Sequence, residues 1–580
     1  MGGFPFVVGV TGHRDLAHSC LDGARAAVRS TLESLQRQFE GVAIEIACGL
    51  AAGADQLVAE VALELGIGVH AVLPMPKAIY RNDFSGEELA KLDKLLGNPK
   101  VSVDEIPLPP GMDRQAVSAT GPQRDRLYAR LGDYLRRRAN LLLALWDGQV
   151  SGLEGGTCDV VLRYLEASSA DKPFAGELEI RPGEPHEVTN SPVAIWIRVD
   201  RAQQHTPGAG QVSYLAGGAR AGQVLSFANL PAPVQERLSA LGEHVVEYRG
   251  LVQAGKLEPG WSLLGDLDTG LLPAELVSRL RSIDEAYVRV DGLALYNQRR
   301  SDRTFAAFGL MAGLMGLLFL LYAKIAALKV FLVGYLVLFA GGFLAYRLAG
   351  QRHWFTRHLV YRVLAESLRV HFFMAVSGSD DRKDVARLFD LTGMRRFPGF
   401  GWVVDALRIA APLATDRLAL DDSRVNLARR LWIADQAEYF KRKTHVLHLE
   451  HERLEKIKRF LFLLSFAGML GLVLLKKLLA GVSISADVDL KTLLVFLIGL
   501  LPLWLGIWEI YQNKMAVREL LWQYRNQADL FAAAAARLES AASDAERRSV
   551  LHDLADRSLH EVYLWAIHRF HREHEPPSAA

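Results

Sequence analysis

The spacing of apolar and polar positions changes character near residue 300. Residues 304–323 form an uncharged run of twenty residues, TFAAFGLMAGLMGLLFLLYA. As an α-helix this run would span about 30 Å, the thickness of the hydrocarbon core of a bilayer. Comparable apolar runs follow at 330–348, 460–479 and 492–511. The pattern predicts four transmembrane helices in two hairpins, and four buried helices of a soluble protein are the alternative.

Before residue 200, short apolar segments alternate with amphipathic ones. The segments at 6–10, 44–48, 69–73, 141–145 and 193–199 indicate strands, and 21–39 has the periodicity of a helix. Alternating units of this length predict an α/β fold with a doubly wound parallel sheet, Rossmann-like, over residues 1–200. Residues 201–283 contain Gly and Pro breaks, which indicate a connecting segment before an all-α transmembrane region.

Basic residues are concentrated on one side of the predicted spans. They flank the start of the first and third spans and the end of the second and fourth, and the two hairpin loops hold only Lys324, Lys329, Lys476, Lys477 and Lys491. By the positive-inside rule, both termini lie in the cytoplasm. The first, second and fourth runs carry no ionisable residue at mid-membrane, which argues against an ion-coupled transporter. Gly309 and Gly313 form a GxxxG motif, typical of close helix packing and compatible with an oligomeric pore.

Composition then narrows the function. The 580 residues contain 67 Lys and Arg against 65 Asp and Glu, a net charge of +2. This is too balanced for a protein that holds nucleic acid by neutralising phosphates. The three cysteines, Cys20, Cys48 and Cys158, show neither a disulfide framework nor metal-ligand spacing. The mean hydropathy of +0.11 is the average of apolar spans and a soluble domain.

Histidines recur with helical spacing in two places. They are His445, His448 and His451, and then His568, His571 and His574. Three histidines so spaced lie partly on one helix face and could bind zinc. No carboxylate or thiolate completes the spacing, so we expect surface histidines and no metal site.

A short motif is repeated after the second and fourth spans, as YRVLAE at 361–366 and YRNQAD at 524–529. In each copy the arginine and the acid are four residues apart, which predicts an ion pair on a helix surface. With WIADQAEYFK at 432–441 before the third span, these motifs resemble the SLATT family. SLATT proteins have two transmembrane helices flanked by cytoplasmic helices and occur beside nucleotide-signalling systems in bacterial conflict loci. The resemblance implies two tandem units, 284–430 and 431–575, before a disordered tail at 576–580.

Glycine-containing loops follow the strands predicted in the N-terminal region. They are TGHRDL at 11–16, GLAAGADQL at 49–57, LPMPKAIYRNDF at 73–84, ALWDG at 144–148 and GGT at 155–157. In a doubly wound sheet, ligands bind beyond the carboxyl ends of the strands. Glycines permit close backbone approach, and helix starts favour phosphate. Neither GxGxxG nor a Walker A loop is present. The pair His13-Arg14 suits an anion, whereas ordinary turns would explain the glycines, and helix capping would explain Asp55.

Together the loops resemble the SLOG superfamily, Rossmann-like domains related to the cytokinin-activating LOG enzymes and to the ligand-sensing domain of melastatin-type cation channels. The resemblance implies that a nucleotide-derived ligand is bound by Thr11, Gly12, His13, Arg14, Gly53, Asp55, Tyr80, Asp83, Trp146, Asp147, Gly155, Gly156 and Thr157. LOG enzymes carry PGGxGTxxE, whose glutamate acts in cleaving a ribose-to-base bond. Here the glutamate position holds Val160 and the proline position Glu154. Asp159 lies next to the glutamate position and could substitute for it, so the loss of the glutamate argues against a hydrolase without excluding one.

These expectations combine into a membrane effector. We expect a cytoplasmic sensor of an NAD-derived or cyclic ADP-ribose-like second messenger, supplied by an upstream nucleotide-producing enzyme. The sensor is joined to a homo-oligomeric module that permeabilises the bacterial inner membrane, in anti-phage defence by abortive infection. No other cofactor and no nucleic-acid partner are expected. A membrane-tethered hydrolase of LOG or NADase type and a ligand-free membrane scaffold are the alternatives.

Overall fold

The computed structural model describes residues 5–39, 42–109, 112, 117, 121–166, 178–184, 187, 191–202, 209–218, 222–257, 260–379, 397, 399–410, 420–475, 489–515 and 517–573. The chain divides into two compact units. We call them the α/β unit, Met1–Arg289 with Ser367–Ala419, and the helical unit, Val290–Glu366 with Leu420–Ala580. The expected tail at 576–580 lies outside the described residues.

A nine-stranded sheet forms the centre of the α/β unit, in the order β4-β3-β2-β1-β5-β7-β8-β9-β6. The first six strands in this order are parallel: β4 (Val101–Glu105), β3 (Gly68–Leu73), β2 (Ile44–Cys48), β1 (Phe6–Gly12), β5 (Leu141–Trp146) and β7 (Val193–Arg198). The central strand β5, LLLALW, is buried at all six positions, as expected for a parallel strand covered on both faces. The predicted parallel α/β sheet is therefore confirmed for these strands.

The sheet continues past the predicted end of the domain at residue 200. β8 (Val212–Gly217) is added antiparallel to β7, β9 (Gln223–Phe227) pairs antiparallel with β8, and β6 (Glu179–Pro182) pairs parallel with β9. The sheet is thus mixed, and 201–283 is more than a connection. The short strands escaped prediction because their apolar patterns are weak: four of the five residues of β4 are exposed, and β6 has no buried residue.

Helices cover the sheet and complete the α/β unit. They are α1 (His18–Gln38), α2 (Ala54–Glu64), α3 (Lys77–Tyr80), α4 (Gly86–Leu96), α5 (Pro122–Arg138), α6 (Thr157–Tyr164), α7 (Ala232–Gln253) and α12 (Val403–Ala410). The helix α1 shows why they form here, since Ala24, Val28 and Leu32 recur at helical spacing and are fully buried. α1 packs beside α2, and α5 beside α6.

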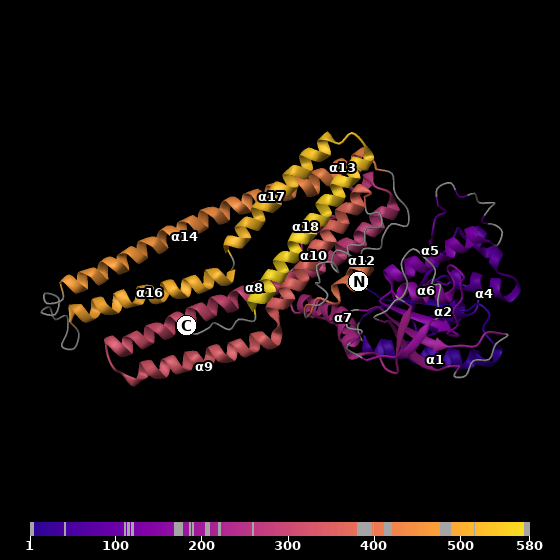
Figure 1. Cartoon of the computed structure of the whole chain (residues 1–580), viewed down its shortest axis with the longest axis horizontal. Coiled ribbons are helices and arrows are strands. Elements are labelled where there is room, and N and C mark those ends of the chain that lie inside the picture. Colours follow the sequence, from indigo (N-terminus) through magenta and orange to yellow (C-terminus); the bar gives the residue numbers. More distant parts are fainter. Residues whose placement is uncertain are drawn as a thin grey trace. The chain divides into compact units, whose positions relative to one another are not determined.

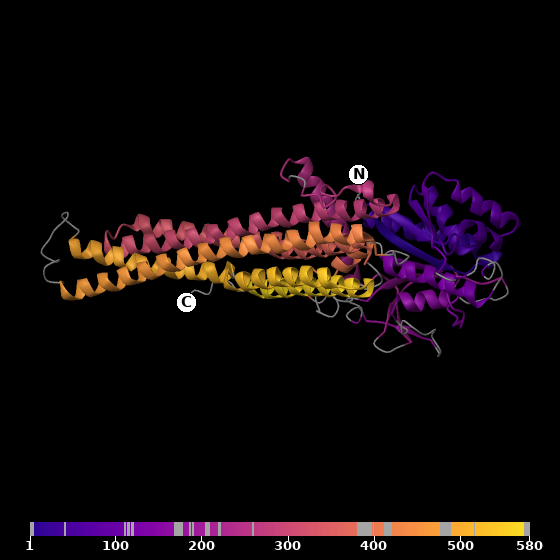
Figure 2. The ribbon, with the colours of Figure 1, turned by 90° about the horizontal axis from the view of Figure 1, so that it is seen from above.

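Long helices make up the helical unit. They are α8 (Ala274–Lys324, which begins in the α/β unit), α9 (Lys329–Arg352), α10 (Trp354–Ser377, which ends in the α/β unit), α13 (Asp422–Ala428), a π-helical segment (Arg429–Ala434), α14 (Asp435–Leu474), α16 (Leu490–Met515), α17 (Val517–Ser540) and α18 (Asp544–Glu573). Figures 1 and 2 show α8 with α9, and α14 with α16, as pairs of neighbouring helices. α17 packs against both α14 and α18.

Among the described residues, four helices are long and apolar enough to cross a membrane, and each overlaps one of the predicted spans. No more than 11% of any apolar window is buried within the chain. Large side chains such as Val330, Phe460 and Val473 are 65%, 64% and 69% exposed. Apolar surface on this scale is foreign to a soluble monomer and fits a lipid surrounding. Of the predicted third span, 476–479 lie outside the described residues.

Small residues allow helices of the helical unit to approach closely. A Cβ at Gly313 of α8 would lie 3.0 Å from the Trp504 ring of α16, and one at Gly316 would lie 2.3 Å from Leu503. The Gly309 position has no atom within 4 Å. Only one glycine of the GxxxG motif therefore serves helix packing inside the chain.

The two halves of the helical unit have the same order of helices. A long helix of 51 or 40 residues carries the first span, a helix of 24 or 26 residues carries the second, and a 24-residue helix follows. The predicted ion pair forms in the first copy, where Arg362 lies 2.7 Å from Glu366 and 3.2 Å from Asp291. In the second copy, Arg525 and Asp529 are both exposed and form no ion pair with each other. The prediction was wrong there because two solvated side chains gain little from pairing.

Candidate functional site

The carboxyl ends of five parallel strands meet at one edge of the sheet. β3, β2, β1, β5 and β7 are neighbours in this order, and each is followed by a loop. All thirteen residues predicted to surround a ligand lie at these strand ends or in the loops and helix starts that follow them. We call this region the carboxyl edge. It is where a doubly wound sheet normally binds its ligand.

Two glycines bring the first loop against the start of α2. Gly53 has φ +77°, and a Cβ there would lie 2.4 Å from the Arg14 carbonyl oxygen and 2.6 Å from that of His13. A Cβ at Gly12 would lie 2.3 Å from the Cβ of Ala54. In this close arrangement, the Ala54 N–H donates to the His13 carbonyl oxygen at 3.0 Å. Glycine is therefore required at both positions by backbone proximity.

His13 reaches across to the loop after β5. Its Nε2 lies 3.0 Å from Asp147 Oδ1 and 3.2 Å from the Asp147 backbone nitrogen. Asp147 is 3% exposed, and its Oδ1 also accepts the Gln149 N–H at 2.9 Å. A protonated imidazole donates to the carboxylate, whereas a neutral ring with a free Nε2 accepts the backbone N–H. This pair ties the two loops together in either protonation state.

Asp55 organises the loop between β2 and α2. Its Oδ2 accepts the N–H groups of Gly49 at 3.1 Å and Ala51 at 3.3 Å. The buried Tyr80 hydroxyl donates to the Gly49 carbonyl oxygen at 2.9 Å. Burial raises the pKa of Asp55 to about 7, although the loop N–H groups and Arg14 act in the opposite direction. Asp55 therefore shapes the loop from inside and does not line its surface.

A chain of polar contacts runs from the interior to an exposed cation. The buried Arg124 places its Nη2 2.6 Å from Asp83 Oδ1, and the Tyr128 hydroxyl donates to the other oxygen of the same carboxylate. Arg14, which is exposed, lies with its Cζ 4.8 Å from the centre of the Tyr128 ring. Burial raises the pKa of Tyr128 to about 12, which keeps it a neutral donor. Asp83 is thus occupied by Arg124 and Tyr128, while Arg14 faces solvent over an aromatic ring.

Arg124 and Tyr128 were missed by sequence reasoning. Both lie on α5, and Tyr128 is 45 residues from Asp83. Their spacing of four residues places them on one face of a helix. That spacing was the only available signal, and it does not say which loop the face meets.

The last loop packs tightly on α5. Gly155 has φ +74°, and a Cβ there would lie 2.6 Å from the backbone nitrogen of Ala129. Asp159 is 5% exposed and accepts the Gly155 N–H at 2.8 Å and the Arg163 Nε–H at 2.8 Å. Its carboxylate therefore holds the loop.

Val160, the position at which the resemblance would place the glutamate of LOG enzymes, faces the interior. Val160 is 5% exposed, and its Cγ2 lies 2.8 Å from where a Cβ on Gly132 would be. A carboxylate placed there would be buried against α5, and burying a charge costs free energy unless it is paired. The packing of α6 on α5 therefore suits an apolar side chain at this position.

Two of the predicted ligand residues are part of the core. Trp146 is 1% exposed, its ring lies 5.9 Å from that of Trp196, and its Nε1–H donates to the Gln149 carbonyl oxygen at 3.2 Å. Thr11 is also buried, 9% exposed near the end of β1. The Trp146 ring therefore lies in the core and supports the loop through its hydrogen bond to Gln149. Trp146 is a core residue because β5 is buried along its whole length.

Among the described residues, no group of three or more His, Cys, Asp and Glu side chains is arranged to hold a metal ion. His448 lies 3.4 Å from Glu452, as expected of a helix-surface histidine. His574 lies outside the described residues, as does the side chain of His571. A comparison with known protein families found no family model that matches the chain, and no curated protein matches it significantly.

Proposed function

We propose that this chain is a membrane effector. Its α/β unit senses a nucleotide-derived second messenger, NAD-derived or cyclic ADP-ribose-like. Its helical unit permeabilises the bacterial inner membrane as an oligomer, in anti-phage defence by abortive infection. The observation that carries the proposal is the carboxyl edge, where the exposed Arg14 lies over the Tyr128 ring beside the glycine loops. The described part of the same chain has four apolar helices whose surfaces are exposed.

The chemistry of the carboxyl edge suits a phosphorylated ligand. Arg14 supplies a permanent cation with donors that match phosphate oxygens. The helices α2 and α6 begin at this edge, and the N–H groups of a first helical turn favour an anion. Tyr128 offers a ring beside the cation, on which a base or ribose can pack. Phosphate, ribose and base together indicate a nucleotide.

Sensing is favoured over hydrolysis because neither position 160 nor position 159 offers an unengaged carboxylate. Cleavage of an N-glycosidic bond needs a carboxylate that stabilises positive charge or activates water. Val160 supplies none, and Asp159 is engaged by Arg163 and the Gly155 N–H. Release of nicotinamide or adenine by the purified chain would instead support the hydrolase alternative.

Arg14→Ala is expected to abolish stabilisation of the protein by its ligand. At a ligand concentration of a hundred times Kd, binding stabilises a folded protein by about 2.7 kcal/mol. The measurement is the melting temperature of the purified chain with ADP-ribose and cyclic ADP-ribose as probes. Arg37→Ala, an exposed arginine at the end of α1, is the control and should behave like wild type. Equal stabilisation of the Arg14 variant would remove this residue from the site.

Messenger-dependent leakage is the second expected result. The purified chain in liposomes should release an encapsulated dye when the messenger is added, and the Arg14→Ala variant should not. The reason is that a ligand shifts the membrane helices only through a difference in affinity between two states of the protein. If ADP-ribose or a cyclic nucleotide binds and no dye is released, the permeabilising part of the proposal is wrong.

A further inference from the structure

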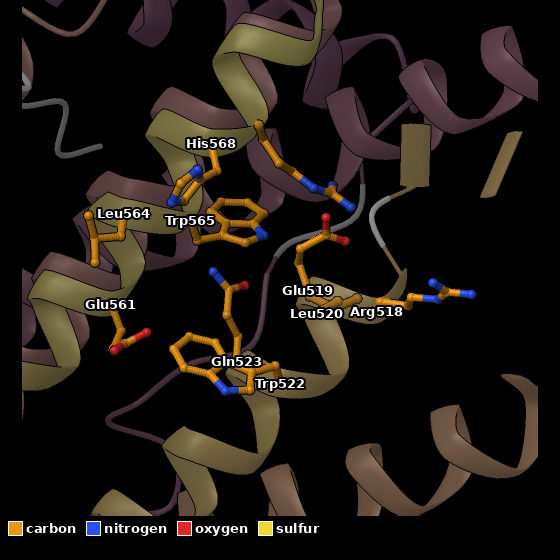
Figure 3. A pocket seen from close by; sticks show the side chains of 10 residues that line it. Arg518, Glu519, Leu520, Trp522, Gln523, Glu561, Leu564, Trp565 and His568 are labelled. Atoms are coloured by element: carbon orange, nitrogen blue, oxygen red, sulfur yellow. The ribbon is translucent and has the colours of Figure 1, made fainter. Parts of the chain in front are cut away.

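A pocket of about 380 Å³ lies between the start of α17 and the last turns of α18. Figure 3 shows its lining: Arg518, Glu519 and Trp522 come from α17, and Glu561, Trp565 and His568 from α18. Both helices belong to the helical unit. The pocket is separate from the carboxyl edge, and the proposed function gives it no role.

The pocket lies next to the end of a candidate span. α17 begins at Val517, two residues after α16 ends at Met515. Arg518 is nine residues along the chain past Glu509, the last residue of the candidate span. Trp508 lies near the end of the same window, and tryptophan is enriched at the membrane interface. If α16 crosses the membrane, as the proposed function requires, Arg518 follows directly after the end of the membrane helix and the pocket lies near the membrane surface.

The lining combines aromatic rings with charges of both signs. Trp522 is 62% exposed, which is unusual for so large an apolar side chain in water. The guanidinium of Arg569 lies 5.4 Å from the centre of the Trp565 ring. Two arginines, Arg518 and Arg569, are matched by two carboxylates, Glu519 and Glu561. A balanced pocket of this kind complements a ligand that carries one negative and one positive group.

We propose that this pocket binds a phospholipid with a phosphoethanolamine headgroup. The phosphodiester is held by Arg518 and the cationic side of the pocket, since arginine donates to two phosphate oxygens at once. The primary ammonium is held by Glu561 and by the face of Trp522, a cation–π contact. The glycerol and upper acyl chain pack against Leu564 and Trp565, which complete the apolar part of the lining. Such a lipid anchors the α17–α18 pair to the bilayer surface.

Lipid retention by the full chain tests this assignment. The chain is purified in detergent, incubated with phosphatidylethanolamine or phosphatidylglycerol of identical acyl chains, and examined by native mass spectrometry. Wild type should retain more phosphatidylethanolamine than phosphatidylglycerol. Arg518→Ala combined with Glu561→Gln should lower retention of phosphatidylethanolamine about tenfold, the loss expected for charge-assisted hydrogen bonds. Arg525→Ala, an exposed arginine of α17 outside the pocket, should retain it like wild type.

The outcomes separate this site from the proposed function. Equal retention of both lipids by wild type, or undiminished retention of phosphatidylethanolamine by the double variant, would overturn the assignment. A preference for phosphatidylglycerol would overturn it in favour of an anionic-lipid site. The assay needs neither the messenger nor a pore. Lipid retention without dye release would therefore leave the pocket standing while the permeabilising function fails.

Discussion

Gly53→Ala is expected to destabilise the α/β unit by about 2–4 kcal/mol, the range for a substitution that introduces both backbone strain and a steric clash. Gly53 has φ +77°, a conformation that alanine adopts only with strain. Its Cβ would also lie 2.4 Å from the Arg14 carbonyl oxygen, which is backbone and cannot rotate away. The start of α2 would therefore be pushed from the first loop, and the hydrogen bond from Ala54 to His13 would be lost with it.

The matched control for this substitution is Gly23→Ala. Gly23 lies inside α1, and a Cβ there meets no atom within 4 Å. Because alanine favours the helix over glycine, this variant should be as stable as wild type or up to about 1 kcal/mol more stable. Thermal and chemical unfolding of the purified chain measure both effects. If Gly53→Ala unfolded like Gly23→Ala, the close contact between the first loop and α2 would be wrong.

Asp55→Asn is expected to flatten the dependence of stability on pH. The pKa of Asp55 is raised from 3.8 to about 7 by burial, so the folded chain holds this proton more tightly than the unfolded chain. The stability that the protonated form contributes is present at low pH and is lost as the pH rises through about 7. Between pH 5 and pH 8 this loss amounts to about 3 kcal/mol. Asparagine has no such proton, and its carbonyl oxygen can still accept the Gly49 and Ala51 N–H groups.

The measurement is the unfolding free energy of wild type and Asp55→Asn at several pH values from 5 to 8. The variant should lose less stability than wild type across this range and should be the more stable of the two at pH 8. Asp22→Asn, which removes an exposed carboxyl group on α1, should reproduce the wild-type profile. Parallel profiles for wild type and Asp55→Asn would show that Asp55 is ionised in the folded chain throughout the range.

The sequence foretold those parts of the fold whose signal is local. The four apolar runs and the strand Leu141–Trp146 are continuous apolar segments, and no distant residue is needed to recognise them. By contrast, Val101–Glu105 has a single buried residue and no apolar pattern that would mark it as a strand. It forms a strand because it pairs with β3 at the edge of the sheet. β8 likewise takes its place through antiparallel pairing with β7, and β9 through antiparallel pairing with β8, because neither strand has a strong pattern of its own.

The residues of the candidate site also divide into those with a local sequence signal and those without one. Glycine loops at strand ends are visible in the sequence because each loop follows its own strand. Arg124 and Tyr128 complete the site from a helix that the loop patterns do not mention, and their partner Asp83 is at least 41 residues away along the chain. The burial of Trp146 was equally invisible, because a tryptophan next to Asp147 and Gly148 has the same sequence context whether its ring points inward or outward.

The division of the chain into two units, each built from two separated segments, has a consequence for its synthesis on the ribosome. α12 supplies Asp405, whose Oδ2 lies 3.3 Å from Arg237 Nε on α7, and Trp402 stacks on His244 of the same helix at 4.8 Å. These partners emerge after α8 and α9 have been made. The α/β unit therefore finishes folding only after the segment that forms α8 and α9 has been translated. A fragment that stops at residue 289 would leave Arg237 buried without this carboxylate, so the α/β unit is completed by a segment that is made after α8 and α9.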